Sequence, residues 1–229
     1  MINDQLKYTL SFLIVTIMVL IIIVRTSQSS ETPEDDAQNI VFNWAILHKE
    51  KSGQKKDLNL KRKLLLSSGD EFKIFIQPIE NVYIYLYLLD TDDNLSLLFP
   101  YRIEDLDDNY VLGHEYYIPQ TGWAYMDENI GTTETFYMLA SRERLHTLEV
   151  LTSEYGKASG NTKKSVQAKV LAEIKSTFMR FSSLADRFAE KPIPKAGTLR
   201  SFEKKDPADS AVQIKAENFY GKTIRIEHK

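Results

Sequence analysis

The chain has 229 residues, of which 43% are hydrophobic and 27% are charged, and its formal net charge is -3. This nearly balanced charge provides no basic field that would attract nucleic acid. The absence of cysteine excludes disulfides, thiolate nucleophiles, iron–sulfur clusters and sulfur-ligated zinc within this chain. We therefore expect no nucleic-acid partner and no cofactor.

The first feature along the chain is an uncharged hydrophobic run from Tyr8 to Val24 (YTLSFLIVTIMVLIIIV). As a helix this run would be roughly 25 Å long, close to the hydrocarbon thickness of a bilayer, about 30 Å. A helix buried in a globular core would show polar positions on one face, which this run lacks. We predict a single transmembrane helix over residues 8–25, contacting the membrane through residues 8–24, after a short N-terminus over residues 1–7.

The charges that flank the hydrophobic run predict its orientation. Lys7 and the amino terminus precede it, and an acidic group follows it: Glu31, Glu34, Asp35 and Asp36. The more positive flank stays in the cytoplasm, so we expect the C-terminal part to be exported to the periplasm or beyond the cell. Ser27 and Ser29 leave signal-peptide cleavage open, although Arg25 and the length of the run favour a retained anchor.

Beyond a polar, acidic stalk over residues 26–39, the sequence predicts a β-rich domain over residues 40–229. Apolar positions alternate at period two in short stretches, and turn residues separate them. The expected strands are Ile40–Lys49, Leu58–Leu66, Phe72–Ile76 ended by Pro78, Val82–Leu88, Leu95–Phe99, Glu115–Ile118, Gly122–Met126, Glu134–Ala140, Ala211–Ala216 and Lys222–Glu227. We predict a mainly β (α+β) fold with an antiparallel β-sandwich-like domain, closed by strands within residues 211–228.

Two helical patterns interrupt these strands. The shorter one has apolar residues at helical spacing from Leu145 to Tyr155 and ends at Gly156. The longer one is an amphipathic helix over residues 163–189, which begins after the capping pair Asn161–Thr162. Its apolar stripe consists of Val166, Val170, Ile174, Phe178, Phe181, Ala185 and Phe188. We expect this stripe to pack on one face of the sandwich, with partner binding as the alternative.

Two short motifs resemble functional signatures but are better explained as turns. Gly69-Asp70-Glu71-Phe72 spells most of the diguanylate cyclase signature, yet β-like segments surround it instead of helices. Asp90, Asp92 and Asn94 have the spacing of a calcium loop, but Leu95 stands where such a loop needs glycine. We expect a hairpin turn there, with weak calcium binding as the alternative, and no metal site elsewhere.

The tyrosines of one strand leave two interpretations open. Tyr83, Tyr85 and Tyr87 share one face of the strand, and Trp123 follows in a nearby element. The long helix would cover this face if it belongs to the core. An exposed face would instead offer an aromatic platform for sugars or for a protein partner.

The order of motifs between residues 58 and 144 resembles the bacterial family called domain of unknown function 4384. The matching elements are Ser68–Asp70, the aromatic strand Val82–Leu88, the turn Asp90–Asn94, the close Leu98–Pro100, Gly113 and Tyr117–Pro119. The C-terminal NFYGKTIRIEHK is similar to a tail of membrane-anchored members. The resemblance implies a β-rich accessory domain without an established enzymatic role, and it supplies no catalytic residues.

The functional expectation is a non-catalytic, single-pass membrane-tethered module of the bacterial envelope. We find no paired histidine spacing, nucleophile elbow or phosphate-binding glycine loop, and we nominate no catalytic residue. The first hypothesis is an accessory or scaffolding domain that binds an envelope protein. The second is a carbohydrate or cell-wall glycan module that uses Tyr83, Tyr85, Tyr87 and Trp123. The third is a hydrolase whose site is assembled only in the folded chain.

Overall fold

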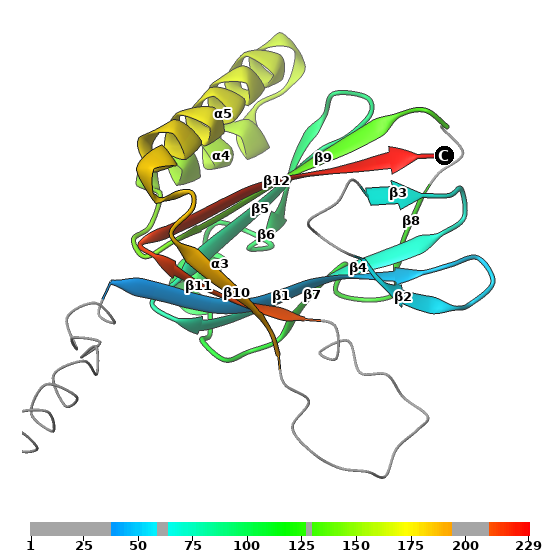
Figure 1. Ribbon diagram of the computed structural model, residues 1–229. Coiled ribbons are helices and arrows are strands. Elements are labelled where there is room, and N and C mark those ends of the chain that lie inside the picture. The colour runs from blue at the N-terminus through cyan, green and yellow to red at the C-terminus, as the bar shows by residue number, and fades with distance from the viewer. Residues whose placement is uncertain (1–37, 59–63, 127–129, 194–210) are drawn as a thin grey trace, which may run out of the picture. The chain divides into compact units, whose positions relative to one another are not determined.

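The computed structural model describes residues 38–58, 64–126, 130–193 and 211–229, which form a mainly β unit with two sheets and few helices (Figure 1). The strands are β1 (Asn39–Lys49), β2 (Lys55–Asp57), β3 (Leu64–Leu66), β4 (Glu71–Glu80), β5 (Tyr83–Leu89), β6 (Leu95–Phe99), β7 (Tyr116–Ile118), β8 (Ala124–Tyr125), β9 (Thr133–Ser141), β10 (Phe188–Pro192), β11 (Val212–Glu217) and β12 (Phe219–His228). The helices are α3 (Asp105–Asp108), α4 (His146–Lys157), α5 (Gly160–Arg180) and the short 3-10 helix η1 (Ser182–Leu184).

The strands form two sheets. Sheet A has the order β10-β11-β1-β4-β7, with β2 on β1 and β8 on β4, and sheet B has the order β3-β12-β9-β5-β6. Between the described strands every pairing is antiparallel except that of β3 with β12. In sheet A, β1 therefore lies between β4 and β11. Trp44 of β1 pairs with Val212 of β11, far away in the sequence.

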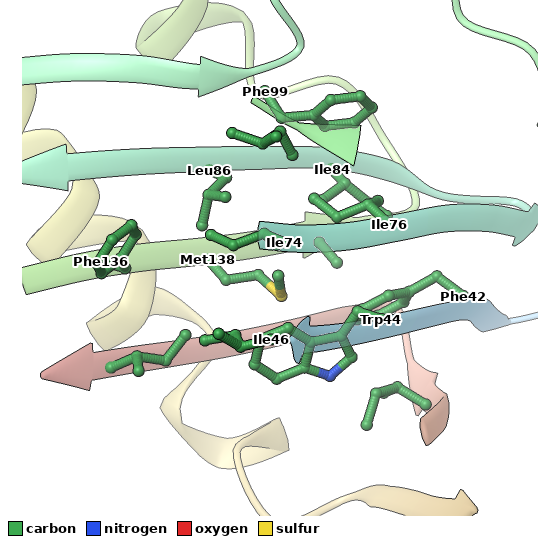
Figure 2. Packing of buried hydrophobic residues seen from close by; sticks show 14 of the residues in the cluster. Phe42, Trp44, Ile46, Ile74, Ile76, Ile84, Leu86, Phe99, Phe136 and Met138 are labelled. Atoms are coloured by element: carbon green, nitrogen blue, oxygen red, sulfur yellow. The ribbon is translucent and has the colours of Figure 1, made fainter. Parts of the chain in front are cut away.

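The main core consists of side chains from both sheets. Phe42, Trp44 and Ile46 alternate along β1 and are almost inaccessible to solvent. They belong to the same buried cluster as Ile84 and Leu86 of β5 (Figure 2). Strand periodicity of two directs these residues inward and their neighbours outward. The predicted β-rich architecture is confirmed, although the parallel β3–β12 pair makes sheet B mixed.

The second core layer lies between sheet B and the helices. Tyr85 of β5 and Leu139 of β9 are buried in one cluster with Leu148 of α4 and with Val170 and Ile174 of α5. In Figure 1, α4 and α5 lie together on one side of sheet B. The apolar stripe predicted for the long helix therefore packs against sheet B from Val170 to Phe181.

The long helix ends at Arg180, so the expectation that it continues to residue 189 is wrong. Phe181 stacks on Phe219 with ring centres 4.4 Å apart, and the chain then turns through η1. Phe188 begins β10, which pairs with β11, and its ring packs against Tyr220. The sheet edge supplies hydrogen bonds to this segment, so the strand replaces the last predicted turns of helix.

Pro78 does not end its strand, because β4 continues to Glu80. The register between β1 and β4 shifts beside Pro78, between Val41 and Phe42. On its other side β4 pairs with β7 only from Ile74 to Ile76. A proline, which lacks an amide hydrogen, is tolerated where the ladder is irregular and no strand pairs with it on one side, and the Pro78 carbonyl there accepts a hydrogen bond from the Gly113 amide.

The predicted transmembrane segment over residues 8–25 and the stalk up to residue 37 lie outside the described residues. Within residues 38–58, 64–126, 130–193 and 211–229, no helix combines the length and the apolar character that crossing a membrane requires.

Two glycines provide a matched test of how α5 docks on sheet B. A Cβ at Gly221 of β12 would lie 2.5 Å from a ring carbon of Phe178, whereas a Cβ at Gly156 of α4 would meet open space. We expect Gly221→Ala to lower the free energy of unfolding by about 1–3 kcal/mol, because the Phe178 ring must move. Gly156→Ala should raise it by about 0.5 kcal/mol, because alanine loses less backbone entropy in a helix. Urea denaturation of both variants checks the pair, and equal shifts would contradict the close packing.

Candidate binding site

Tyr85 and Tyr87, the central residues of the predicted tyrosine face, are buried under α4. The Tyr85 hydroxyl donates to Oε1 of Glu149 at 2.5 Å and accepts a hydrogen bond from the Leu145 amide. The Tyr87 hydroxyl lies 2.8 Å from Oγ1 of Thr152. Burial raises the pKa of both hydroxyls, and the Glu149 carboxylate raises that of Tyr85 further. Their hydroxyls thus bond within the domain beneath a helix, but the partners come from the shorter helix α4 and not, as expected, from the long helix.

The four aromatic residues nominated from the sequence do not form one surface. Tyr85 and Tyr87 are at most 1% exposed, so an exposed platform that includes them is excluded in this conformation. Tyr83 is half-buried and stacks on Tyr110 with ring centres 5.8 Å apart. Trp123 lies on the outer face of sheet A, where the ammonium of Lys73 is 5.8 Å from its ring centre. Alternation assigned the tyrosines to one face correctly, but it could not show that α4 covers this face.

Glu149 of α4 connects this helix to β5 directly and to α3 through Arg144. Besides Tyr85 of β5, its carboxylate binds the guanidinium of Arg144 through Nε and through Nη2, the latter at 2.8 Å. Arg144 also pairs with Asp107 of α3. The Glu149 end of this network is enclosed, since its side chain is 5% exposed, whereas the Asp107 end is open to solvent. Its arrangement positions α3 and α4 on the sheet.

A pocket of about 420 Å³ lies where the edges of the two sheets meet, and we call it the aromatic pocket. Phe99 ends β6, the edge strand of sheet B, and Tyr116 begins β7, an edge strand of sheet A. The connection between them carries α3 and supplies most of the remaining wall. The lining residues are Phe99, Pro100, Tyr101, Arg102, Asp105, Asn109, Tyr110, Tyr116 and Gln120.

Hydrogen bonds to the backbone fix the tyrosines of the aromatic pocket. The hydroxyl of Tyr110 donates to the Val82 carbonyl at 2.8 Å, and that of Tyr101 donates to the Tyr117 carbonyl at 2.9 Å. Burial raises the pKa of both hydroxyls. Because the hydroxyls have partners within the domain, the rings present mainly apolar surface to the pocket.

Tyr116 holds the loop that forms the rim. Its hydroxyl donates to the Asn109 carbonyl and accepts a hydrogen bond from the Val111 amide. Val111 and Leu112, which follow Tyr110 in the chain, are 56% and 51% exposed. Two exposed aliphatic residues therefore follow the lining residue Tyr110 in a loop that the lining residue Tyr116 holds, although neither lines the pocket itself.

An ion pair borders the aromatic pocket. Nη2 of Arg102 donates to Oδ1 of Asp105 at 2.8 Å, and the Arg102 amide donates to Oδ2. Burial alone would raise the pKa of Asp105, but hydrogen bonds from Arg102 and Asn109 outweigh it, so the pKa lies below its ordinary value. A ligand in the pocket would therefore meet a carboxylate, a guanidinium and an amide beside the rings.

The residues proposed as a weak calcium loop form the turn of the β5–β6 hairpin. Oδ1 of Asp90 accepts hydrogen bonds from the amides of Asp92 and Asn94, and Oδ2 accepts one from the Asn94 side chain. The predicted hairpin is confirmed by the antiparallel β5–β6 pairing. Across the part of the chain that the structure describes, no three His, Asp or Glu side chains group as metal ligands would.

The aromatic residues nominated from the sequence were Tyr83, Tyr85, Tyr87 and Trp123, and none of them lines the aromatic pocket. The missing information is tertiary, because the wall combines the end of β6 with the start of β7. A usable signal was present in the family motifs, since Leu98–Pro100 ends at the pocket wall and Tyr117–Pro119 lies between the lining residues Tyr116 and Gln120.

Comparison with known proteins supports the family resemblance for the middle of the chain. Residues 66–144 match the family model described as "Domain of unknown function (DUF4384)". Every residue that lines the aromatic pocket lies inside this matched segment. No curated protein and no solved structure matches the chain significantly.

Proposed function

We propose that the chain is a membrane-tethered, non-catalytic module of the bacterial envelope, which binds a protein partner through the aromatic pocket. The observation that carries this proposal is the pocket of about 420 Å³ with tyrosine and phenylalanine walls beside the exposed Val111 and Leu112. Protein interfaces place aromatic anchors in such pockets and surround them with further apolar contacts. The fixed rim lowers the entropy lost on binding.

The tether in this proposal is the uncharged run from Tyr8 to Val24 with the acidic stalk after it. A flexible tether keeps the module near its partners and so raises their effective concentration. The flanking charges favour export of the domain. A phosphatase reporter fused after Lys229 should be active outside the cytoplasm, and a cytoplasmic reporter would contradict the envelope assignment.

A carbohydrate or cell-wall glycan is the second candidate ligand, favoured by the side chains of Asp105 and Asn109 beside the aromatic rings. Sugars bind where rings stack on their faces and polar side chains accept or donate hydrogen bonds at their edges. Two exposed aliphatic residues at the rim suit a protein better, which is why we place the protein partner first.

A crosslinking experiment tests the protein partner. A photoreactive benzoylphenylalanine at position 112 should form protein-sized adducts in cells, while the same group at position 150, an equally exposed valine of α4, should not. Adducts equal at both positions, or absent at both, would contradict binding at the rim.

We expect the combined variant Val111→Asp and Leu112→Asp to remove the partner while the thermal unfolding temperature stays unchanged, because both side chains are exposed. Val150→Asp is the matched control. The readout is co-purification of the crosslinked partner. Sedimentation of the protein with peptidoglycan serves as the second assay. The glycan would be favoured if the wild type sediments, the rim variant does not, and position 112 forms no protein adduct.

A further inference from the structure

A second pocket, of about 470 Å³, lies next to the aromatic pocket, and we call it the basic pocket. It is bordered by β6, by the end of α4 and by the start of α5. Arg102 lines both pockets, which makes them neighbours on either side of this side chain. A ligand that fills one pocket can therefore extend into the other.

Positive charge exceeds negative charge around the basic pocket. Its charged lining residues are Arg102, Lys157 and Lys163 against the single acid Glu104, and because Arg102 is already paired with Asp105, the two lysines carry the excess. Within the described residues, no carboxylate forms an ion pair with Lys157 or Lys163. This local excess contrasts with the net charge of -3 of the whole chain.

The two lysines are explained only in part by the fold. Lys157 lies in the last turn of α4, where a cation is favoured by the helix dipole. The ammonium of Lys163 lies 5.1 Å from the ring centre of Tyr155, another lining residue. Lys163, however, stands near the N-terminus of α5, where the helix dipole disfavours a positive charge. The dipole accounts for Lys157 and the Tyr155 ring for part of the placement of Lys163, but no described carboxylate neutralises either ammonium, so both can pair with an anionic ligand.

β6 connects the two pockets. Its residues Leu95 and Leu97 line the basic pocket, and its last residue, Phe99, lines the aromatic pocket. Among the described strands β6 pairs only with β5, so its other edge carries no strand. An extended peptide advances about 3.3 Å per residue, so a segment of about five residues spans this edge. Addition of a strand at a free edge is a common mode of peptide recognition.

We infer that the partner contributes an extended acidic–aromatic segment to this surface. Its aromatic side chain enters the aromatic pocket, and its acidic side chains, about four residues away along the strand, meet Lys157 and Lys163 in the basic pocket. This inference rests on the proposed function, because it names the kind of segment that the aromatic pocket receives.

The test uses full-length protein in detergent and fluorescein-labelled synthetic peptides. The probes are the peptide Gly-Ser-Trp-Ser-Thr-Thr-Glu-Glu-Gly and the peptide with the reversed sequence, because the bound segment can run parallel or antiparallel to β6. Matched peptides replace both glutamates by glutamine or by lysine, and another replaces tryptophan by alanine. By fluorescence anisotropy at low salt, we expect the glutamate peptide in the favoured direction to bind about tenfold more tightly than the glutamine peptide, and the lysine peptide to bind most weakly. This preference should shrink at high salt, which screens the charges.

The paired variants Lys157→Glu and Lys163→Glu should reverse the charge preference. Lys169→Glu with Lys175→Glu, two exposed positions of α5, is the matched control and should leave it unchanged. Tryptophan peptides that bind equally whatever their charge would overturn the inference while the proposed function stands. Failure of every tryptophan peptide to bind would count against the peptide-binding aromatic pocket itself. Two results together would assign the lysines to a lipid surface and overturn the inference. The peptides would bind without any charge preference, and phosphatidylglycerol vesicles would bind the wild type but not the Lys157→Glu and Lys163→Glu double variant.

Discussion

Replacing Glu149 by alanine is expected to lower the free energy of unfolding by about 3–4 kcal/mol. The substitution removes the acceptor of the buried Tyr85 hydroxyl and the main partner of Arg144. A buried donor without an acceptor and a cation without its carboxylate both keep their desolvation cost while losing the interaction that offset it. Urea denaturation followed by tryptophan fluorescence measures the loss.

Two controls separate the network from the helix that carries it. Glu154→Ala alters an exposed residue of the same helix and should change stability by less than about 0.5 kcal/mol. Glu149→Gln keeps an acceptor for Tyr85 but removes the charge that holds Arg144, so its effect should lie between the two. Equal denaturation midpoints for Glu149→Ala and Glu154→Ala would show that the network contributes little.

The same substitution should also affect the candidate binding site. Arg144 links Glu149 to Asp107 of α3, and α3 begins at Asp105, which lines the aromatic pocket. If the network loosens, the Arg102–Asp105 pair loses part of its support. We therefore expect weaker partner binding in Glu149→Ala even under conditions where the domain stays folded.

The second large effect is expected at Asp70, where alanine should lower the free energy of unfolding by about 3 kcal/mol near neutral pH. The Asp70 carboxylate is buried, lies 2.9 Å from Nε2 of His48 and accepts hydrogen bonds from the amides of Ser67 and Lys51. These contacts connect the turn before β4 to His48 of β1 and to Lys51 in the turn that follows β1. Asp92→Ala, at an exposed turn position, is the control and should be nearly neutral.

The contribution of Asp70 should depend on pH in a defined direction. Burial by itself raises the pKa of Asp70, but hydrogen bonds from Ser67, His48 and Lys51 outweigh it, so the pKa lies below the ordinary 3.8. A carboxylate whose pKa is lowered on folding stabilises above its unfolded-state pKa and loses this contribution as the pH falls through the folded-state pKa. Stability should therefore decrease below about pH 4, where the unfolded chain takes up the proton more readily.

Asp70→Asn provides the matched measurement, because it retains an acceptor oxygen and cannot titrate. The difference in unfolding free energy between wild type and Asp70→Asn should be largest near neutral pH and shrink as the solution becomes acidic. A difference that stays constant from pH 7 to pH 3 would contradict the lowered pKa. The result would also assign a structural role to Asp70 of the Gly69–Phe72 motif, since its side chain holds two turns together.

Local sequence determined most of the secondary structure. Alternation along β1 and β5 predicted both strands and the face each side chain occupies, because successive side chains of a strand point to opposite sides. Helical spacing of Val166, Val170 and Ile174 predicted the buried side of α5 for the same kind of reason. Asp90 and Asn94 predicted the hairpin turn, since an aspartate side chain can bind the amides of its own turn.

Tertiary structure decided what each face meets. The tyrosines of β5 alternate identically whether solvent or a helix covers them, and only the docking of α4 placed Glu149 and Thr152 at their hydroxyls. β10 exists because β11 offers it an edge, so no local pattern revealed it. The aromatic pocket likewise requires the ends of β6 and β7 to meet. Periodicity is a property of neighbouring residues, whereas pockets and covered faces depend on contacts between residues far apart in the chain.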